Sequence, residues 1–208
     1  MAVREATIKA EEVPEVLLRK EFRIISDLIA DSSHVLDLGC SEGDLLAWLA
    51  EHKNVQARGV EIAQEKVRRC VQRGLSVFQG DINQGLQDFP DHCFDYVILS
   101  QTMQAVRQPL TVLREMRRVG HRFIVTFPNF GHWSVRLSLL FGGRAPKTGH
   151  LPYEWHNSPN IRMLTILDFE DVLREEGLQV EKAFFLRRSE QVALWPNFRA
   201  DSAIYLLK

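Results

Sequence analysis

The sequence has few cysteines, almost no net charge and no long hydrophobic run, and each shortage excludes a class of protein. Its three cysteines, Cys40, Cys70 and Cys93, contain no C-x-x-C pair, so neither a disulfide framework nor a zinc site is expected. A formal net charge of -1 leaves no electrostatic footprint for nucleic acid. No apolar stretch approaches a membrane span, and the leading tail lacks the apolar core of a signal peptide. We therefore expect a cytoplasmic protein that binds neither nucleic acid nor a membrane.

What the sequence does contain is an alternation of helix and strand patterns. Its 208 residues, 45% of them hydrophobic, suffice for one domain with a sizeable core, which we expect to comprise residues 1–208. The alternation predicts an α/β fold with a doubly wound, mostly parallel sheet. The expected strands are residues 35–38, 55–60, 75–78, 94–99, 123–127, 178–186 and 202–207. The expected helices are residues 16–30, 45–50, 63–73, 109–119 and 164–176, with a short one at 133–141.

The most informative stretch is VLDLGCSEGDLLAWLA, residues 35–50, which passes from a strand pattern through a turn into a helix. Gly39 and Gly43 bracket the turn. Glycine allows a ligand to approach the backbone closely, and the helix that follows offers unpaired N–H groups to acceptor atoms. The pattern is typical of a nucleotide-binding turn.

Spacing separates the nucleotides that such a turn could bind. A dinucleotide fingerprint would need glycine where Ser41 and Asp44 stand, and a P-loop would need G-K-[ST] after the turn. An acidic residue at the helix entrance would also repel a pyrophosphate. S-adenosylmethionine has no phosphate, and it carries an ammonium and a sulfonium, so the acidic turn favours this ligand.

Acidic residues also stand near the ends of three successive strands. Asp37 precedes the turn, Glu61 ends the second strand and Asp81 follows the third. Taken alone, Asp37 could be a helix-end cap, Glu61 a solvated charge and Asp81 a turn former. Together, at one edge of a predicted parallel sheet, they favour a ligand site.

These residues resemble the class I S-adenosylmethionine-dependent methyltransferases, whose first motif is approximately D-x-G-x-G-x-G. Asp37, Gly39 and Gly43 match it, and Ser41 departs from it. The resemblance implies a Rossmann-like, seven-stranded sheet with an antiparallel edge strand. It also implies that Glu61 holds the ribose hydroxyls and that Asp81 accepts from the adenine amino group. The cofactor would be S-adenosylmethionine or S-adenosylhomocysteine, and its expected contacts are Asp37, Gly39, Cys40, Ser41, Gly43, Glu61, Ile62, Asp81, Ile82 and Ser100.

A long aromatic segment, residues 128–162, follows the fifth strand and is expected to form a cap. Its aromatics could wall an acceptor pocket, with His132, Tyr153 or His156 as a proton acceptor. They could instead anchor another protein, or simply cover the sheet. No metal site is expected at the histidines, because no carboxylate or cysteine accompanies them at a recurring spacing.

Three blocks narrow the resemblance to the MetW family of bacterial methionine-biosynthesis proteins: SQTMQAV at 100–106, TFPNFGHW at 126–133 and LPYEWHNSPNI at 151–161. Members are associated with homoserine O-acyltransferase. The resemblance therefore implies a protein that binds and supports or regulates a homoserine O-acetyltransferase or O-succinyltransferase. The alternative is an active small-molecule methyltransferase. The chain after the fourth strand reads Leu99, Ser100, Gln101, Thr102, which is not the D/N-P-P-Y motif of amino-group methyltransferases.

Overall fold

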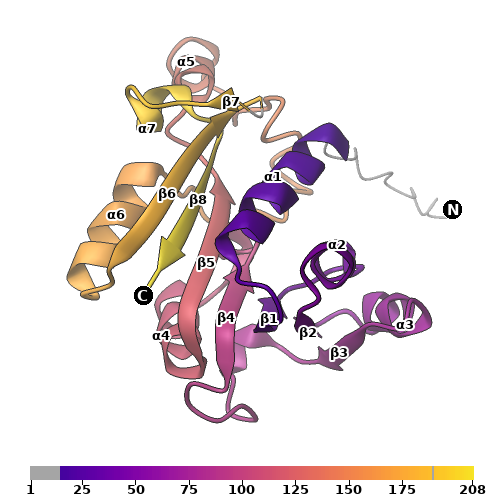
Figure 1. Cartoon of the computed structure of the whole chain (residues 1–208). Helices are drawn as coiled ribbons and strands as arrows, with labels where there is room; N and C mark the ends of the chain where they lie inside the picture. The colour runs from indigo at the N-terminus through magenta and orange to yellow at the C-terminus, as the bar shows by residue number, and fades with distance from the viewer. Residues whose placement is uncertain (1–14, 189) are drawn as a thin grey trace, which may run out of the picture.

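The computed structural model describes residues 15–188 and 190–208, which form one eight-stranded sheet flanked by helices (Figure 1). The leading tail, which is expected to lack a signal peptide, lies mostly outside the described residues. The strands are β1 His34–Leu38, β2 Gln56–Glu61, β3 Ser76–Gln79, β4 Phe94–Leu99, β5 Gly120–Pro128, β6 Val180–Arg187, β7 Glu190–Gln191 and β8 Ser202–Leu207.

The helices lie close to their expected positions. None of those in the described residues is long and apolar enough to cross a bilayer. They are α1 Glu15–Leu28, α2 Asp44–Lys53, α3 Gln64–Gln72, α4 Pro109–Val119, α5 Trp133–Gly142, α6 Ile166–Glu175 and α7 Pro196–Arg199, with the 3-10 turns η1 Ile82–Gln84 and η2 Met103–Ala105.

The strand order is β3-β2-β1-β4-β5-β8-β6-β7. The first five positions are parallel, and β8 runs antiparallel between β5 and β6. The expected mostly parallel, doubly wound sheet is thus confirmed. The structure adds an eighth strand to the seven expected, because the two residues of β7 pair with the end of β6. A strand of two residues is too short to show a periodic pattern in the sequence.

The strands alternate their side chains between two apolar cores, as the pleat requires. Leu36, Val97 and Phe123 face one side, where α4 and α6 pack. Val35, Ile98 and Ile124 face the other side, beneath α1 and α2. Because both faces are covered at the centre of the sheet, β1, β4 and β5 appear in the sequence as largely apolar runs.

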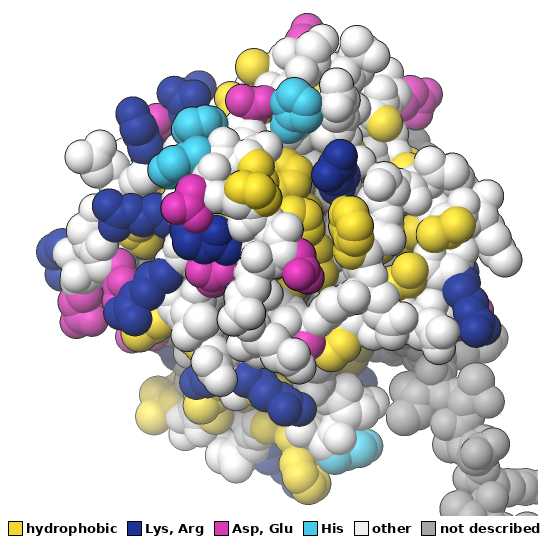
Figure 2. Space-filling view, turned by 90° about the horizontal axis from the view of Figure 1, so that it is seen from below, with side chains coloured by type: hydrophobic (Ala, Val, Ile, Leu, Met, Phe, Trp, Pro, Cys, Tyr) yellow, Lys and Arg dark blue, Asp and Glu magenta, His cyan; other side chains and the backbone are white. Residues whose placement is uncertain are grey.

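The connection from β3 to β4 leaves part of one face uncovered. Residues 80–93, all of them described, form only η1 and otherwise turns. A cavity of about 640 Å³ lies along this part of the sheet, and Phe78, Phe89 and Cys93 are among the residues that line it. Viewed from below, Figure 2 shows hydrophobic side chains exposed among Lys, Arg, Asp and Glu.

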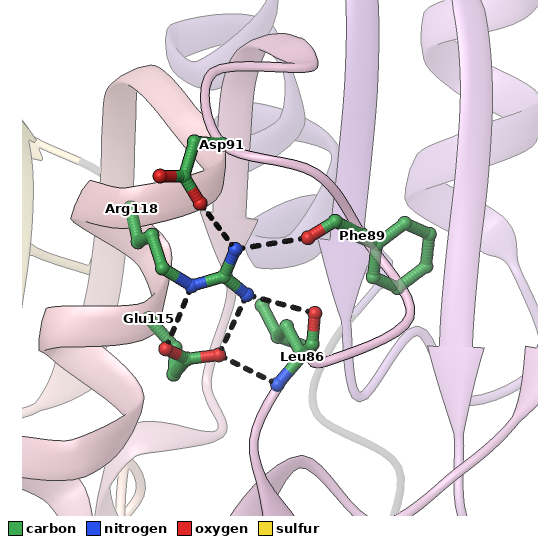
Figure 3. A network of polar contacts seen from close by, with 5 residues as sticks. All are labelled: Leu86, Phe89, Asp91, Glu115 and Arg118. Atoms are coloured by element: carbon green, nitrogen blue, oxygen red, sulfur yellow. Dashed lines mark hydrogen bonds and ion pairs between the residues drawn. The ribbon is translucent and has the colours of Figure 1, made fainter.

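Arg118 on α4 fastens this connection to the fold (Figure 3). Its guanidinium donates to the carbonyl oxygens of Leu86 and Phe89, each at 2.9 Å, and to Asp91 at 2.7 Å. Glu115, one turn earlier, accepts from Arg118 and from the Leu86 N–H. The two side chains therefore replace, for this loop, the backbone hydrogen bonds that a helix would have supplied.

We expect Arg118→Ala to lower the free energy of unfolding by about 1–3 kcal/mol, because it leaves two carbonyl groups and Glu115 without their donor. The matched control is Arg114→Ala on the same helix, whose ion pair with Glu176 lies at the surface. The control should cost clearly less stability, because a surface ion pair is screened by solvent. Urea denaturation of both variants measures the difference, and equal losses would contradict this role of Arg118.

Candidate functional site

The turn between β1 and α2 is built from three residues with positive φ. Gly39 has φ +74°, Ser41 +51° and Gly43 +80°. A Cβ at Gly39 would lie 2.8 Å from Thr102 Cγ2, and one at Gly43 would lie 2.4 Å from Leu75 Cδ1, so both positions require glycine. Ser41 adopts the left-handed conformation that glycine adopts most easily. The departure from the glycine motif therefore leaves the path of the backbone as a glycine would have it.

Glu61 joins the end of β2 to this turn. One carboxylate oxygen, Oε2, accepts from the N–H of Ser41 at 2.9 Å, and the other, Oε1, accepts from the N–H of Ala63 at 2.9 Å. The side chain is 5% exposed. The backbone of the turn also bonds to β2 directly. The N–H groups of Gly39 and Cys40 both donate to the Val60 carbonyl, at 2.7 and 3.1 Å.

Asp37 is a second buried carboxyl group beside Glu61, with 3% of its surface exposed. Burial, reinforced by the Glu61 carboxylate, raises the pKa of Asp37 to about 7. Two acids in so small a volume disfavour a second negative charge. A bound cation would reverse that preference.

Asp81 lies at the end of β3, and the side chains around it differ in exposure. Its Oδ1 accepts from the Asn83 N–H at 2.9 Å and from Asn83 Nδ2 at 2.8 Å, so Asp81 caps η1. Ile82 is buried at 9% exposure, while Ile62, which follows Glu61, is 61% exposed. Asp81 also borders the cavity beside β3, whereas Gly39 and Glu61 do not line it.

The tip of β4 carries Ser100, and the structure places an unexpected acid beside it. Ser100 Oγ donates to Glu21 on α1 at 3.3 Å. Glu21 was not among the residues expected from the sequence, where it is one acid on an amphipathic helix. No local motif marks it, and only the packing of α1 against the ends of β4 and β5 brings it there.

The expected proton acceptors of the cap lie apart from the carboxylates. His132 caps α5, its Nδ1 lies 2.7 Å from Ser134 Oγ, and its buried Nε2 has no partner in the described residues. Burial lowers the pKa of His132 and brings that of His150, which packs edge-on against it, to about 4. His156 is exposed beside Trp155, and Tyr153 is half-buried. None of their described hydrogen bonds or ring contacts reaches Asp37, Glu61 or Asp81.

In the part of the chain that the structure describes, no group of three or more His, Cys, Asp or Glu side chains is placed to hold a metal ion. Cys40, within the glycine turn, and Cys70, on α3, are free thiols. Cys70 Sγ donates to the Ser41 carbonyl at 3.2 Å, which adds one more contact to the turn.

The cap segment is fastened to the loop after β4. The N–H groups of Ile161 and Arg162 both donate to the Gln104 carbonyl, at 3.0 and 3.1 Å. The Arg162 side chain then donates to the carbonyls of Val106 and Arg107. Gln104 Nε2 in turn donates to the Gln101 carbonyl at 2.7 Å, so the cap and the tip of β4 are connected through one residue.

The sheet order and this turn define the class of protein: the chain has the fold of the S-adenosylmethionine-dependent methyltransferases. A solved SAM-dependent methyltransferase from Archaeoglobus fulgidus superposes with a TM-score of 0.64, covering 95% of this chain and 94% of that one at 14% identity. The [4+2]-cyclase SpnF superposes with a TM-score of 0.69, covering 97% of this chain and 85% of that one, also at 14% identity. Such low identities establish the fold and leave the reaction open.

The chain belongs to the MetW family, because the family model for methionine biosynthesis protein MetW matches residues 19–207. It is 36% identical over 203 residues to the bifunctional methionine biosynthesis protein MetXA/MetW of Rhodopirellula baltica. The match covers 91% of this chain and 33% of that protein. The chain spans less than half the length of the curated relatives it matches.

The raised pKa of Asp37 predicts how stability depends on pH. Between its ordinary value of 3.8 and about 7, the folded protein retains a proton that the unfolded chain has lost. Stability therefore falls as the pH rises through this window. Asp37→Asn removes the contribution, so the stability of the variant should increase relative to the unsubstituted protein from about pH 5 to about pH 8.

Urea denaturation across that range measures the effect. Asp27→Asn makes the same chemical change at an exposed position of α1 and is the control, which should follow the unsubstituted protein. If the Asp37→Asn curve ran parallel to that of the unsubstituted protein, the buried acid would not titrate as described.

Proposed function

We propose that the protein binds S-adenosylmethionine, or its product S-adenosylhomocysteine, across the tips of β1, β2 and β3, and that it acts with a homoserine O-acyltransferase. The observation that carries the first half is the pair of buried carboxyl groups, Asp37 and Glu61, beside a turn in which positions 39 and 43 require glycine. Such a pair is costly in an empty site and is stabilised by a ligand that brings hydroxyl donors and positive charge.

The fit can be followed residue by residue. Each oxygen of Glu61 accepts one backbone N–H and keeps a lone pair, so both can still accept the two ribose hydroxyls. Asp81 has Oδ1 engaged by Asn83, and its other oxygen would accept from the adenine amino group. Ile62 is exposed on one side of this space and would cover the adenine ring. Gly39, Cys40, Ser41 and Gly43 supply the close backbone, and Ile82 and Ser100 complete the proposed contacts.

The second half of the proposal rests on the relative from Rhodopirellula baltica, whose name joins MetXA and MetW in one bifunctional protein. Fusion places two functions at high effective concentration, as expected of partners that work in contact. This chain offers an unpartnered apolar surface that suits such a partner. We call it the α5–α7 surface and define it as Leu137, Leu139, Leu140, Phe141, Leu194, Trp195 and Phe198, all of which are exposed.

The α5–α7 surface has the composition of an interface. Leu140 is 73% exposed, Phe141 80% and Trp195 76%, and the two helices lie side by side at the top of Figure 1. A pocket of about 670 Å³ between them is lined by Trp133, Trp195 and Phe198 and bordered by Arg187 and Arg199. Apolar anchors with arginines at the rim fit a partner surface that is apolar with carboxylates around it.

The conformation of Trp195 supports the same conclusion. Its φ is +52°, which is unfavourable for a bulky side chain, and its indole is exposed to solvent. An exposed tryptophan with a strained backbone contributes no stability to the isolated chain. A binding role would explain why both costs are retained.

If the protein both binds S-adenosylmethionine and acts with the acyltransferase, the level of the end product would regulate the acyltransferase. S-adenosylmethionine is made from methionine, so a ligand that binds two states of the complex with different affinity would couple end product to pathway entry. The contact of Ile161 and Arg162 with Gln104 joins the tip of β4 to the cap, and the cap begins with α5. This is the route by which occupancy of the ligand site would reach the partner surface.

A second candidate function is small-molecule methyl transfer, favoured by the fold shared with the methyltransferase of Archaeoglobus fulgidus. Proximity and orientation to the sulfonium can suffice for methyl transfer without a nearby base. His132, Tyr153 and His156 stay the candidate acceptors for that reaction. Incubation with methyl-labelled S-adenosylmethionine and a metabolite pool distinguishes the two functions, provided that Glu61→Ala abolishes any transfer.

The first prediction from this proposal concerns ligand affinity. Glu61→Gln should weaken binding of S-adenosylmethionine by about tenfold or more, because a neutral amide replaces charge-assisted acceptors of the ribose hydroxyls. Isothermal titration calorimetry provides the measurement. Glu65→Gln, two residues beyond Ala63 and exposed on α3, is the control and should bind as the unsubstituted protein does. Unchanged affinity in Glu61→Gln would remove Glu61 from the site.

The second prediction concerns the partner. Leu140→Ser combined with Trp195→Ser should weaken the complex with homoserine O-acyltransferase by about 30-fold or more, the loss expected of central apolar anchors. Val71→Ser, which removes a 58% exposed apolar side chain from α3, is the control and should bind normally. Complex formation and the acyl-transfer rate are followed over a range of S-adenosylmethionine concentrations. No complex and no change of rate at any concentration would contradict the partnership.

A further inference from the structure

Glu21 is a buried acid for which the described side chains provide no positive partner. It lies on α1 and is 8% exposed, and no Lys, Arg or His among the described residues forms an ion pair with it. Its carboxylate receives hydrogen bonds from Thr126 Oγ1, from Ser100 Oγ at 3.3 Å and from Gln101 Nε2, which lies 3.1 Å from both carboxylate oxygens. These donors are neutral. They orient the carboxylate without compensating its charge.

The hydrogen bonds favour the ionised form of Glu21, although burial raises its pKa. Thr126 Oγ1 already accepts from the Gln101 N–H at 3.0 Å, so its own proton is free to point at Glu21. Gln101 can only donate through Nε2. A protonated Glu21 would lose part of this arrangement, whereas a nearby cation would complete it.

The position of Glu21 places it next to the ligand site. The run from Ser100 to Thr102 packs against the glycine turn, since a Cβ at Gly39 would meet the Thr102 side chain at 2.8 Å. In the sheet, β4 lies on one side of β1 and β2 on the other. Glu21 and Glu61 therefore flank the turn from opposite sides.

The ligand is elongated, and its ends differ in chemistry. With the adenosine over β1, β2 and β3, the remaining methionine portion extends toward β4. That portion carries both of the ligand's positive charges, the sulfonium and the ammonium, together with its one carboxylate. Gln101, which turns the chain at the tip of β4, has φ +49°, and its strained backbone is held by hydrogen bonds from its N–H to Thr126 O and Oγ1. The backbone of Gln101 is thereby fixed, and its side-chain amide orients the Glu21 carboxylate.

We propose that Glu21 is the carboxylate that binds the positively charged end of the ligand over the tips of β4 and β5. The proposal rests on the proposed binding of S-adenosylmethionine and adds a residue of α1 to it. Glu21 selects for a compact cation, so the ammonium and the sulfonium are the two groups of this ligand that it could meet. It has no function toward the adenosine.

Three ligands test this by calorimetry on the full chain. S-adenosylmethionine carries both cations, S-adenosylhomocysteine carries only the ammonium, and 5′-methylthioadenosine carries neither. Glu21→Gln keeps the shape and removes the charge, while one of the two acceptor oxygens becomes an amide donor. We expect it to weaken the first two ligands by about tenfold or more and to leave methylthioadenosine unchanged. Loss for S-adenosylmethionine alone would assign Glu21 to the sulfonium and would also support the proposal.

Two results would overturn it. Unchanged affinity for both charged ligands would show that Glu21 is structural, as would an equal loss for all three. If the unsubstituted protein bound none of the ligands, the proposed function itself would fail, which is a separate outcome. Glu21→Asp retains the charge and is the second variant, expected to bind S-adenosylmethionine more tightly than Glu21→Gln; the reverse order would also count against the proposal. Thermal unfolding without ligand verifies that both variants are folded.

Discussion

The shape of the turn proposed to bind the ligand depends on the carboxylate of Glu61. By accepting from Ser41 and Ala63 it joins the end of β1 to the end of β2, and it holds Ser41 in a left-handed conformation that a serine rarely adopts. The same charge is one cause of the raised pKa of Asp37. A single buried side chain therefore sets both the shape of the turn and its electrostatic character. Loss of that side chain would relax the two properties together.

Much of the fold and part of the site could be predicted because the relevant signals are local. Strands covered on both faces appear as apolar runs, and the acids stand directly at the strand ends in the sequence. Gly39, Ser41 and Glu61 do come together, and the sheet has the expected mostly parallel order. The sequence did not indicate how exposed Ile62 and Ile82 are. Each follows one of the acids directly, yet Ile62 is exposed and Ile82 is buried.

The rest depends on contacts between distant segments, which a periodic pattern does not encode. Glu21 meets Ser100 from 79 positions away, and in the sequence it looks like any acid of an amphipathic helix. The two residues of β7 and the four of α7 are too short for a pattern to form. The positive φ of Trp195 gave no signal either, because no glycine or asparagine marks the position. These are also the regions from which the proposals of a charge-binding acid and of a partner surface arise.

The placement of β8 has a consequence for how the chain acquires this structure. β8 follows β6 and β7 in order, yet it pairs with β5 on one side and β6 on the other, in the middle of the antiparallel half of the sheet. As the ribosome extends the chain, β5 emerges long before its neighbour and exposes an unpaired edge of buried apolar residues. Completion of the sheet must await the synthesis of residues 202–207. Until then, β5 has no neighbouring strand on that edge, and its buried apolar residues are open to association with other chains.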